Sequence, residues 1–189
     1  MCSSDLALTR ARVVAGDTAL GANVTQAITE SLCSARDVAT TRADVLAMRR
    51  LMLKEQGNSG LWDIKRVRGG LVETEFIAQF LQLIHARSHP SVLDTNTFAA
   101  LGKLAAAKLL DASHAHDLRQ ACLLYHRITQ LLRLCVDGPY SPHTSPLGLN
   151  QLLAGAALVP DIGSAESLLA DTQARIAAIF DEIIGPAGN

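Results

Sequence analysis

The residues best suited to chemistry lie in one short basic stretch. Lys65, Arg66 and Arg68 place three cations within four positions, and Gly69-Gly70 follows at once. Two glycines allow a tight turn before a helix, whose first N–H groups and positive dipole end attract anions. The stretch therefore predicts a site for an anion such as a nucleotide phosphate. The alternative is a connecting loop with solvated cations, because neither glycine-rich nucleotide motif is present.

Two acids, Glu73 and Glu75, open the helix expected after this stretch. At 100° per residue, Glu73 falls on the apolar stripe that begins at Phe76, whereas Glu75 falls on the polar side with Gln79 and Gln82. A carboxylate on a core stripe needs a partner, which the three cations could supply. A structural ion pair and a ligand site both fit this pattern. If the ion pair forms, Glu73→Gln should destabilise the fold by roughly 1–3 kcal/mol.

The remaining polar residues form no recognisable catalytic or metal-binding group. His85 and His89 have the i,i+4 spacing of helical zinc ligands, but no third ligand is apparent. The sequence holds no nucleophile elbow, Walker motif or HExxH pattern. We therefore predict no catalytic residue and no metal ligand in this chain.

The composition predicts that helices alone position these residues. Hydrophobic residues make up 49% of the 189 positions, charged residues 19% and aromatic residues 4%, and Ala and Leu dominate, as helices favour. A formal net charge of −1 argues against nucleic acid as a partner. The N-terminus does not resemble a signal peptide, and the longest apolar run, 152–159, is too short for a membrane span. We expect a cytoplasmic protein whose four cysteines are buried free thiols.

Apolar spacing predicts an all-α, antiparallel bundle of about seven to eight helices in one domain. The domain is expected to span 7–189, with leading helices over 7–57, a Gly/basic loop over 58–70, central helices over 71–136, a Pro-rich connector over 137–146 and C-terminal helices over 147–189. The individual helices are expected over 7–14, 17–34, 41–56, 71–88, 94–110, 111–136, 149–158 and 164–184. Asp17 is the expected N-cap of the second, and Gly57 the C-terminal cap of the third.

Two runs of residues carry a resemblance to a known family. Positions 62–81, with Trp62-Asp63-Ile64-Lys65 and Gly69 to Leu81, resemble the W-D-L-K…G-G-L-V-D-I-E-F-I-V-Q-Y-L segment of the bifunctional glutamine synthetase adenylyltransferase/deadenylylase. Positions 7–17 are similar to its A-L-T-R-A-R-V-V-A-G-D stretch, and Arg49 lies in a stretch like its M-R-x-R-M run. The similarity extends from residue 7 almost to the end and looks more like the C-terminal, adenylylating half. Residues 1–6 form a stub that fits no family pattern.

The resemblance implies transfer of AMP from ATP, with Mg²⁺, to a tyrosine of glutamine synthetase, and its removal under control of the PII signal protein. It implies that this chain is the helical bundle that follows a nucleotidyltransferase core. The core's G-S…D-x-D acidic motif is absent, so we expect a fragment that is inactive alone and binds neither ATP nor Mg²⁺ tightly. The expected nucleotide-contacting residues are Lys65, Arg66, Arg68, Gly69, Gly70, Glu73 and Glu75.

Glutamine synthetase, PII and the missing nucleotidyltransferase core are the partners that the resemblance implies. An alternative from another class is a helical interaction module that contacts PII, glutamine synthetase or the parent's other domains. A coincidental helical bundle is a third interpretation, which the length of the two motif runs disfavours.

Overall fold

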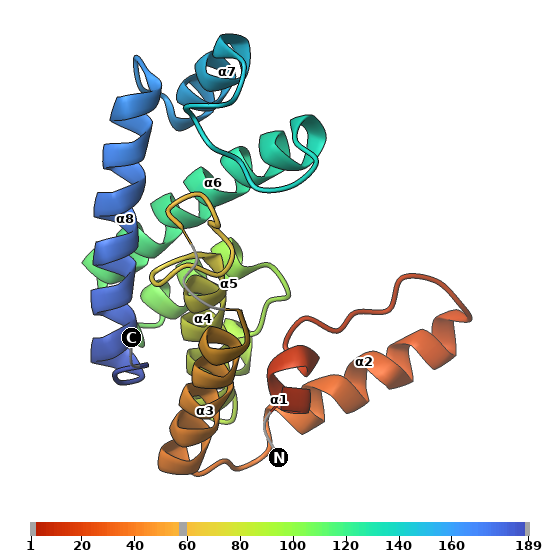
Figure 1. Ribbon diagram of the computed structural model, residues 1–189. Helices are drawn as coiled ribbons and strands as arrows, with labels where there is room; N and C mark the ends of the chain where they lie inside the picture. Colours follow the sequence, from red (N-terminus) through yellow and green to blue (C-terminus); the bar gives the residue numbers. More distant parts are fainter. Residues whose placement is uncertain (1–2, 57–59, 188–189) are drawn as a thin grey trace.

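The computed structural model describes residues 3–56 and 60–187 of the chain (Figure 1). This part contains eight α-helices, one short 3-10 turn and no β-strand, which confirms the predicted all-α helical bundle. The elements are α1 (Ser3–Leu8), α2 (Thr18–Leu32), α3 (Val38–Gln56), α4 (Leu71–His85), η1 (Pro90–Val92), α5 (Thr97–Ala106), α6 (Ala112–Cys135), α7 (Leu147–Ala157) and α8 (Ile162–Ile183).

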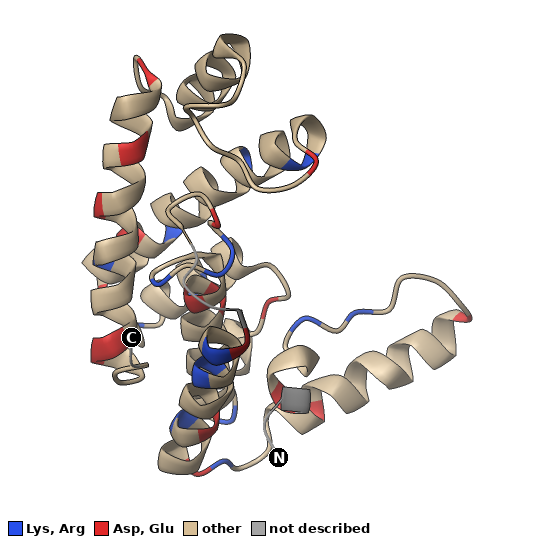
Figure 2. Ribbon diagram, in the orientation of Figure 1, with Lys and Arg blue, Asp and Glu red and all other residues tan. Residues whose placement is uncertain are grey.

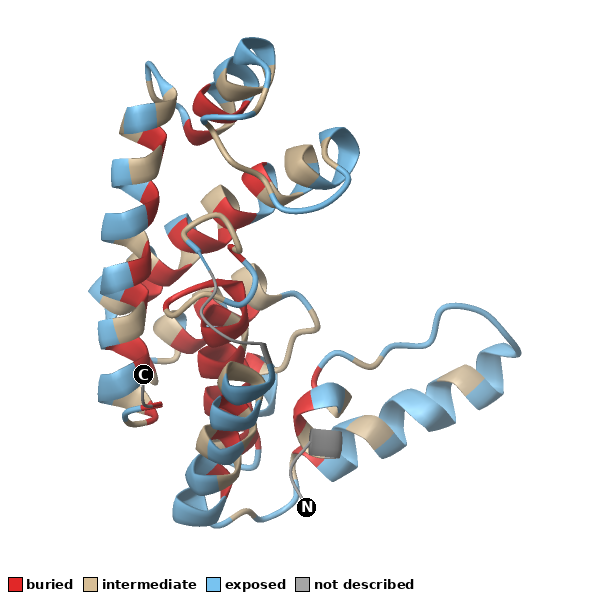
Figure 3. Ribbon diagram, viewed as in Figure 1, coloured by how far each residue is buried: buried red, intermediate tan, exposed pale blue. Residues whose placement is uncertain are grey.

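Helix α4 is the centre of the bundle and packs against α1, α3, α5, α6 and α8. Its apolar stripe is buried, as predicted, and Ile77 and Phe80 are almost wholly inaccessible. The side expected to be polar is buried as well, because Gln79 and Gln82 are 7% and 2% exposed. The Gln82 Oε1 accepts the backbone N–H of Asp94 at 2.8 Å, so this buried amide oxygen is satisfied. Figure 3 shows α4 as the most continuously buried helix of the fold.

Helix α2 extends away from the rest of the molecule as an arm (Figure 1). Asp17 caps it as predicted, because the Asp17 Oδ1 accepts the N–H of Leu20 at 2.9 Å. The apolar stripe expected on this helix is buried only at its end: Leu32 is 4% exposed, whereas Val24 is 42% exposed. The arm therefore carries an apolar surface that the described part of the chain does not cover (Figure 3).

Several predicted helix limits were wrong, and local hydrogen bonds account for the differences. The helix expected over 7–14 ends at Leu8, where the Thr9 hydroxyl donates to the carbonyl of Leu6 at 2.7 Å. The helix expected from position 94 begins at Thr97, because Asn96 is its N-cap. The last helix begins at Ile162 rather than 164, because the Asp161 carboxylate accepts the Ser164 N–H. Residue 57, the expected cap of α3, lies outside the described residues.

Two further helices also differ from the expectation at their ends. Helix α3 begins at Val38, three residues before the predicted start, because the Asp37 Oδ1 accepts the N–H and the hydroxyl of Thr40, each at 2.7 Å. Helix α4 ends at His85 rather than near 88, and the chain turns through η1 at Pro90. The Pro-rich connector over 137–146 is non-helical, as predicted.

Among the described residues, no single helix is long and apolar enough to cross a membrane. Helices α7 and α8 pass that test only as a pair, which bends by 46° at its break, and only by length and composition.

Candidate functional site

The basic loop, here residues 60–70, folds as consecutive tight turns against the start of α4. The Asp63 N–H donates to the Gly60 carbonyl, and the Gly70 N–H donates to the Val67 carbonyl, both at 2.9 Å. The loop also supplies acceptors to the helix: the carbonyls of Ile64 and Lys65 accept the N–H groups of Leu71 and Val72 at 2.9 and 3.1 Å. The first turn of α4 is therefore capped by the loop's own backbone.

Glu73 lies at the centre of a buried ion-pair network that fixes this loop. Its carboxylate accepts Arg49 Nε at 2.8 Å, Arg68 Nη1 at 2.5 Å and the Gly69 N–H at 2.9 Å. The side chains of Glu73 and Arg49 are both fully buried. A buried carboxylate is tolerated when its lone pairs are occupied by charged donors, as they are here. Of the three cations expected as partners, Arg68 pairs with Glu73, whereas Lys65 and Arg66 form no ion pair among the described residues.

Arg49 is the residue of this network that sequence reasoning did not assign a role. Its Nη2 donates to the carbonyls of Arg66 and Val67 at 2.8 and 3.3 Å, so one side chain holds both Glu73 and the loop backbone. The available signal was its position on α3, on the apolar stripe of Val45 and Met48. A cation on a core stripe indicates a buried acid elsewhere.

Arg68 connects the loop to α8. Its Nη2 pairs with Asp181, and its guanidinium lies 5.5 Å from the centroid of the Phe180 ring. Burial alone would lower the pKa of Arg68, but the pairs with Glu73 and Asp181 outweigh burial and raise it. Arg68 therefore links α4 to α8 through its ion pairs with Glu73 and Asp181.

Gly69 and its neighbours are held by the helices behind them. Gly69 has φ +74°, and a Cβ there would lie 1.7 Å from the carbonyl oxygen of Gln173, so only glycine fits. The Tyr125 hydroxyl donates to the Gly69 carbonyl at 2.8 Å, and the Gln173 Nε2 donates to the Leu61 carbonyl at 2.9 Å. Burial, together with the nearby Glu73, raises the pKa of Tyr125. Tyr125 is therefore a core residue.

The N–H groups expected to bind an anion are thus already occupied. Gly69 donates to Glu73, Gly70 to Val67, and Leu71 and Val72 to loop carbonyls. The predicted binding residues divide into buried structural members and an exposed pair, Lys65 and Arg66. Glu75 belongs to neither group, because it pairs with Arg10 at 2.8 Å and joins the segment after α1 to α4. Nucleotide contact by these residues stays a prediction.

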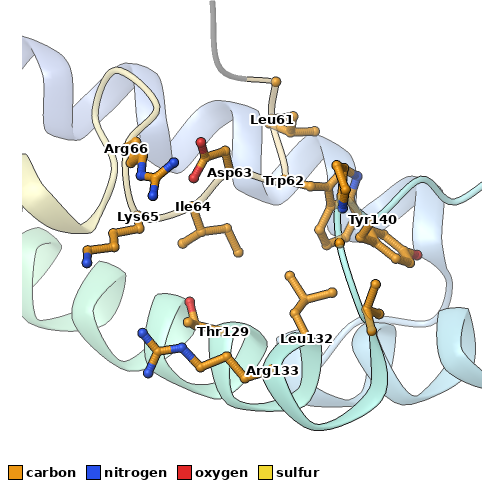
Figure 4. Close-up of a pocket in the computed structure, with 14 residues that line it drawn as sticks. Leu61, Trp62, Asp63, Ile64, Lys65, Arg66, Thr129, Leu132, Arg133 and Tyr140 are labelled. Carbon is orange, nitrogen blue, oxygen red and sulfur yellow. The ribbon is translucent and has the colours of Figure 1, made fainter. Parts of the chain in front are cut away.

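Lys65 and Arg66 lie at the edge of a groove of about 660 Å³ between the loop and the C-terminal half of α6 (Figure 4). Arg133 lies on the opposite side, and Trp62 and Tyr140 form its far end, with their ring centroids 4.7 Å apart. Figure 2 shows several blue positions on the loop and on α3, whereas Glu30 is the single charged residue of α2. The groove therefore places the two exposed cations of the loop beside Arg133 of α6.

The remaining titratable side chains offer little chemistry. Within residues 3–56 and 60–187, no group of three or more His, Cys, Asp or Glu side chains could hold a metal ion. Cys33, Cys122 and Cys135 are free thiols, but only Cys122 is buried, so the expectation of buried cysteines was wrong for the other two. Burial raises the pKa of Cys122 to about 11, a value at which the thiol is unreactive.

Fold and loop together define a helical domain whose central helix is locked to a basic Gly-Gly loop by a buried Glu–Arg network. A family model described as GlnD PII-uridylyltransferase matches residues 24–139, and the chain belongs to this family.

Individual relatives of the chain are named for a different activity. The chain is 39% identical over 95% of its length to the bifunctional glutamine synthetase adenylyltransferase/adenylyl-removing enzyme of Bradyrhizobium diazoefficiens. It is 41% identical over 96% and 95% of its length to the enzymes of the same name from Xanthobacter autotrophicus and Rhodopseudomonas palustris. The resemblance read from the sequence is therefore confirmed. The chain spans 18% of the length of each of these relatives.

Proposed function

We propose that this chain is the C-terminal helical portion of an enzyme that adenylylates and deadenylylates glutamine synthetase. The observation that carries this proposal is 39–41% identity over nearly the whole chain to enzymes named for that activity. The Glu73 network supports it, because Glu73, Gly69 and Gly70 of the family-like segment all serve to hold one loop in place. In this role the bundle is a rigid wall beside a nucleotidyltransferase core.

Catalysis in such an enzyme requires groups that this chain does not supply. Two Mg²⁺ ions stabilise the charge of a transferring nucleotidyl group, and acidic side chains must hold them. The sequence contains no G-S…D-x-D motif. ATP and Mg²⁺ would therefore bind to the core, and this polypeptide alone would be inactive.

An AMP-transfer assay with radiolabelled ATP and glutamine synthetase tests this proposal in two arms. The first arm uses the 189-residue chain alone and should give no incorporation above background. The second uses a chimera in which this chain replaces the matching segment of the Bradyrhizobium relative, and should retain AMP transfer. Activity of the chain alone would refute its proposed inactivity, and an inactive but folded chimera would refute the family role.

The second candidate function is a helical module that contacts PII or glutamine synthetase. The α2 arm favours it, because Val14, Leu20 and Val24 are 81%, 62% and 42% exposed on one projecting segment. A pull-down with purified PII and glutamine synthetase tests it. Binding that the Leu20→Asp/Val24→Asp variant loses, and that Leu134→Asp on α6 keeps, would favour the module. Absence of binding to both proteins would refute it.

A further inference from the structure

The groove beside the basic loop is lined by two separate parts of the chain. Residues 60–66 form one side, and the C-terminal part of α6 with residues 138–140 forms the other. Figure 4 shows Lys65, Arg66 and Arg133 toward one end and the Trp62–Tyr140 pair at the other. Ile64 and Leu132 lie between them. The groove is therefore charged at one end and apolar along the rest.

The cations of the groove are available to a ligand. Lys65, Arg66 and Arg133 are all exposed, and none forms an ion pair or side-chain hydrogen bond among the described residues. Asp63 is the single acid in the lining, so the lining residues carry a formal charge of +2. By contrast, Arg49 of the neighbouring network pairs with Glu73, and Arg68 pairs with Glu73 and Asp181. Two guanidinium groups on facing elements suit carboxylates, which they bind in bidentate geometry.

The aromatic end is rigid and offers carbon surface only. Trp62 Nε1 donates to Glu166 at 3.1 Å, and the Tyr140 hydroxyl donates to Asn150 at 2.5 Å, so both polar atoms are already in use. The two rings meet edge to face. An aromatic or branched apolar side chain gains area and edge-to-face contact against such a wall.

We propose that this groove binds an acidic, extended segment of a partner protein. Carboxylates of the segment pair with Lys65, Arg66 and Arg133, and an apolar side chain a few residues further on packs against the wall formed by Trp62 and Tyr140.

A polyphosphate ligand fits the same groove less well. Phosphates are usually cradled by free backbone N–H groups, and those of Gly69, Gly70, Leu71 and Val72 are occupied. The Asp63 carboxylate in the lining can accept an N–H from a peptide backbone, a donor that a polyphosphate does not offer. Recognition of this kind requires only the groove, and it holds whether or not the activity of the longer relatives extends to this chain.

Trp62 is the single tryptophan of the chain, so its fluorescence reports directly on the groove. We would titrate the full chain with the blocked hexapeptide Glu-Asp-Glu-Gly-Phe-Leu. The comparison probes are Lys-Arg-Lys-Gly-Phe-Leu, Glu-Asp-Glu-Gly-Ser-Ser and AMP. We expect saturable binding of the first peptide, at least about tenfold tighter than any comparison probe, with affinity that falls as salt rises.

Two single variants test whether the acidic peptide binds in the groove. Arg133→Glu should weaken binding of the acidic peptide at least about tenfold. Arg127→Glu, an exposed arginine on α6 outside the groove lining, should leave it within about twofold, and circular dichroism verifies that both variants fold. No saturable binding of the acidic peptide, equal loss in both variants, or tighter binding of AMP that Arg133→Glu abolishes would overturn the proposal.

Discussion

Glu73 and Arg49 lie 24 positions apart, and the Glu73 Oε1 accepts Arg49 Nε at 2.8 Å with both side chains fully buried. This contact joins α3 to α4 through two opposite charges in the core. Breaking one partner of a buried pair leaves an uncompensated charge, which is far more costly than the loss of an exposed pair. The stability of the basic loop therefore depends on a contact that is hidden from any ligand.

Glu73→Gln should lower the free energy of unfolding by about 3–5 kcal/mol, because it leaves the buried guanidinium of Arg49 without a counter-charge. This is more than the roughly 1–3 kcal/mol expected from the sequence, where only the cations of the basic loop were considered as partners. Urea denaturation followed by circular dichroism measures it. Glu75→Gln is the matched control and should cost about 1 kcal/mol or less, since Arg10 is 48% exposed. An unchanged midpoint for Glu73→Gln would contradict the structural role.

Gly69→Ala should destabilise the chain by at least about 3 kcal/mol, because the new Cβ would overlap the Gln173 carbonyl and φ is +74°. Gly155→Ala on α7 is the control: a Cβ there meets nothing within 4 Å, and helix propensity predicts a gain of about 0.5–1 kcal/mol. Thermal melts of both variants decide. Similar melting temperatures for the two variants would contradict the close contact between Gly69 and the Gln173 carbonyl.

Alkylation of the folded chain should separate its cysteines. At pH 8, with the pKa of Cys122 raised to about 11, only about one thiol in a thousand is ionised, and the group is buried. Cys135 is exposed and should react with iodoacetamide before Cys122, as peptide mass spectrometry would record. In urea both should react at comparable rates. Equal alkylation rates for Cys122 and Cys135 in the folded chain would contradict the burial of Cys122.

Acid should weaken the helix starts. Hydrogen bonds from Thr40, Ser113 and Ser164 lower the pKa values of Asp37, Asp111 and Asp161 below their ordinary value of 3.8. A depressed folded-state pKa gives stability that is present above the unfolded pKa and is lost as pH falls through the folded one. The melting temperature should therefore decrease as the pH is lowered below about 4.

Replacing these three caps by asparagine tests this source of acid sensitivity. Asparagine caps a helix about as well but does not titrate, so the triple variant should lose less stability between pH 5 and pH 2 than the wild type does. Melting curves over this range provide the comparison. An equally steep loss in the triple variant would assign acid sensitivity to other groups.

Local patterns were sufficient to predict much of the fold. The N-cap Asp17, the non-helical connector over 137–146 and the burial of Glu73 all follow from capping chemistry, proline content and a 3.6-residue period. Helix ends set by hydrogen bonds of Thr9 and Asn96 were predicted wrongly, because several nearby residues could cap equally well.

Which cations of the basic loop join the buried ion-pair network, and which stay exposed, could not be predicted from the sequence. Lys65, Arg66 and Arg68 are equivalent as letters, and only the turns of the loop direct Arg68 toward Glu73. Arg133 and Tyr140, which complete the groove, come from a helix and a connector about 70 positions further on. Contacts over such separations depend on how the helices pack, which residue spacing does not specify.

A double-mutant cycle between Arg49 and Glu73 tests most directly the claim that this network, rather than a bound ligand, holds the basic loop. Urea unfolding would be measured for wild type, Arg49→Met, Glu73→Leu and the double variant, without added ligand. We predict a coupling energy of at least about 2 kcal/mol, because each single change strands a buried charge and the double change removes both. Costs that add within about 0.5 kcal/mol would contradict the account.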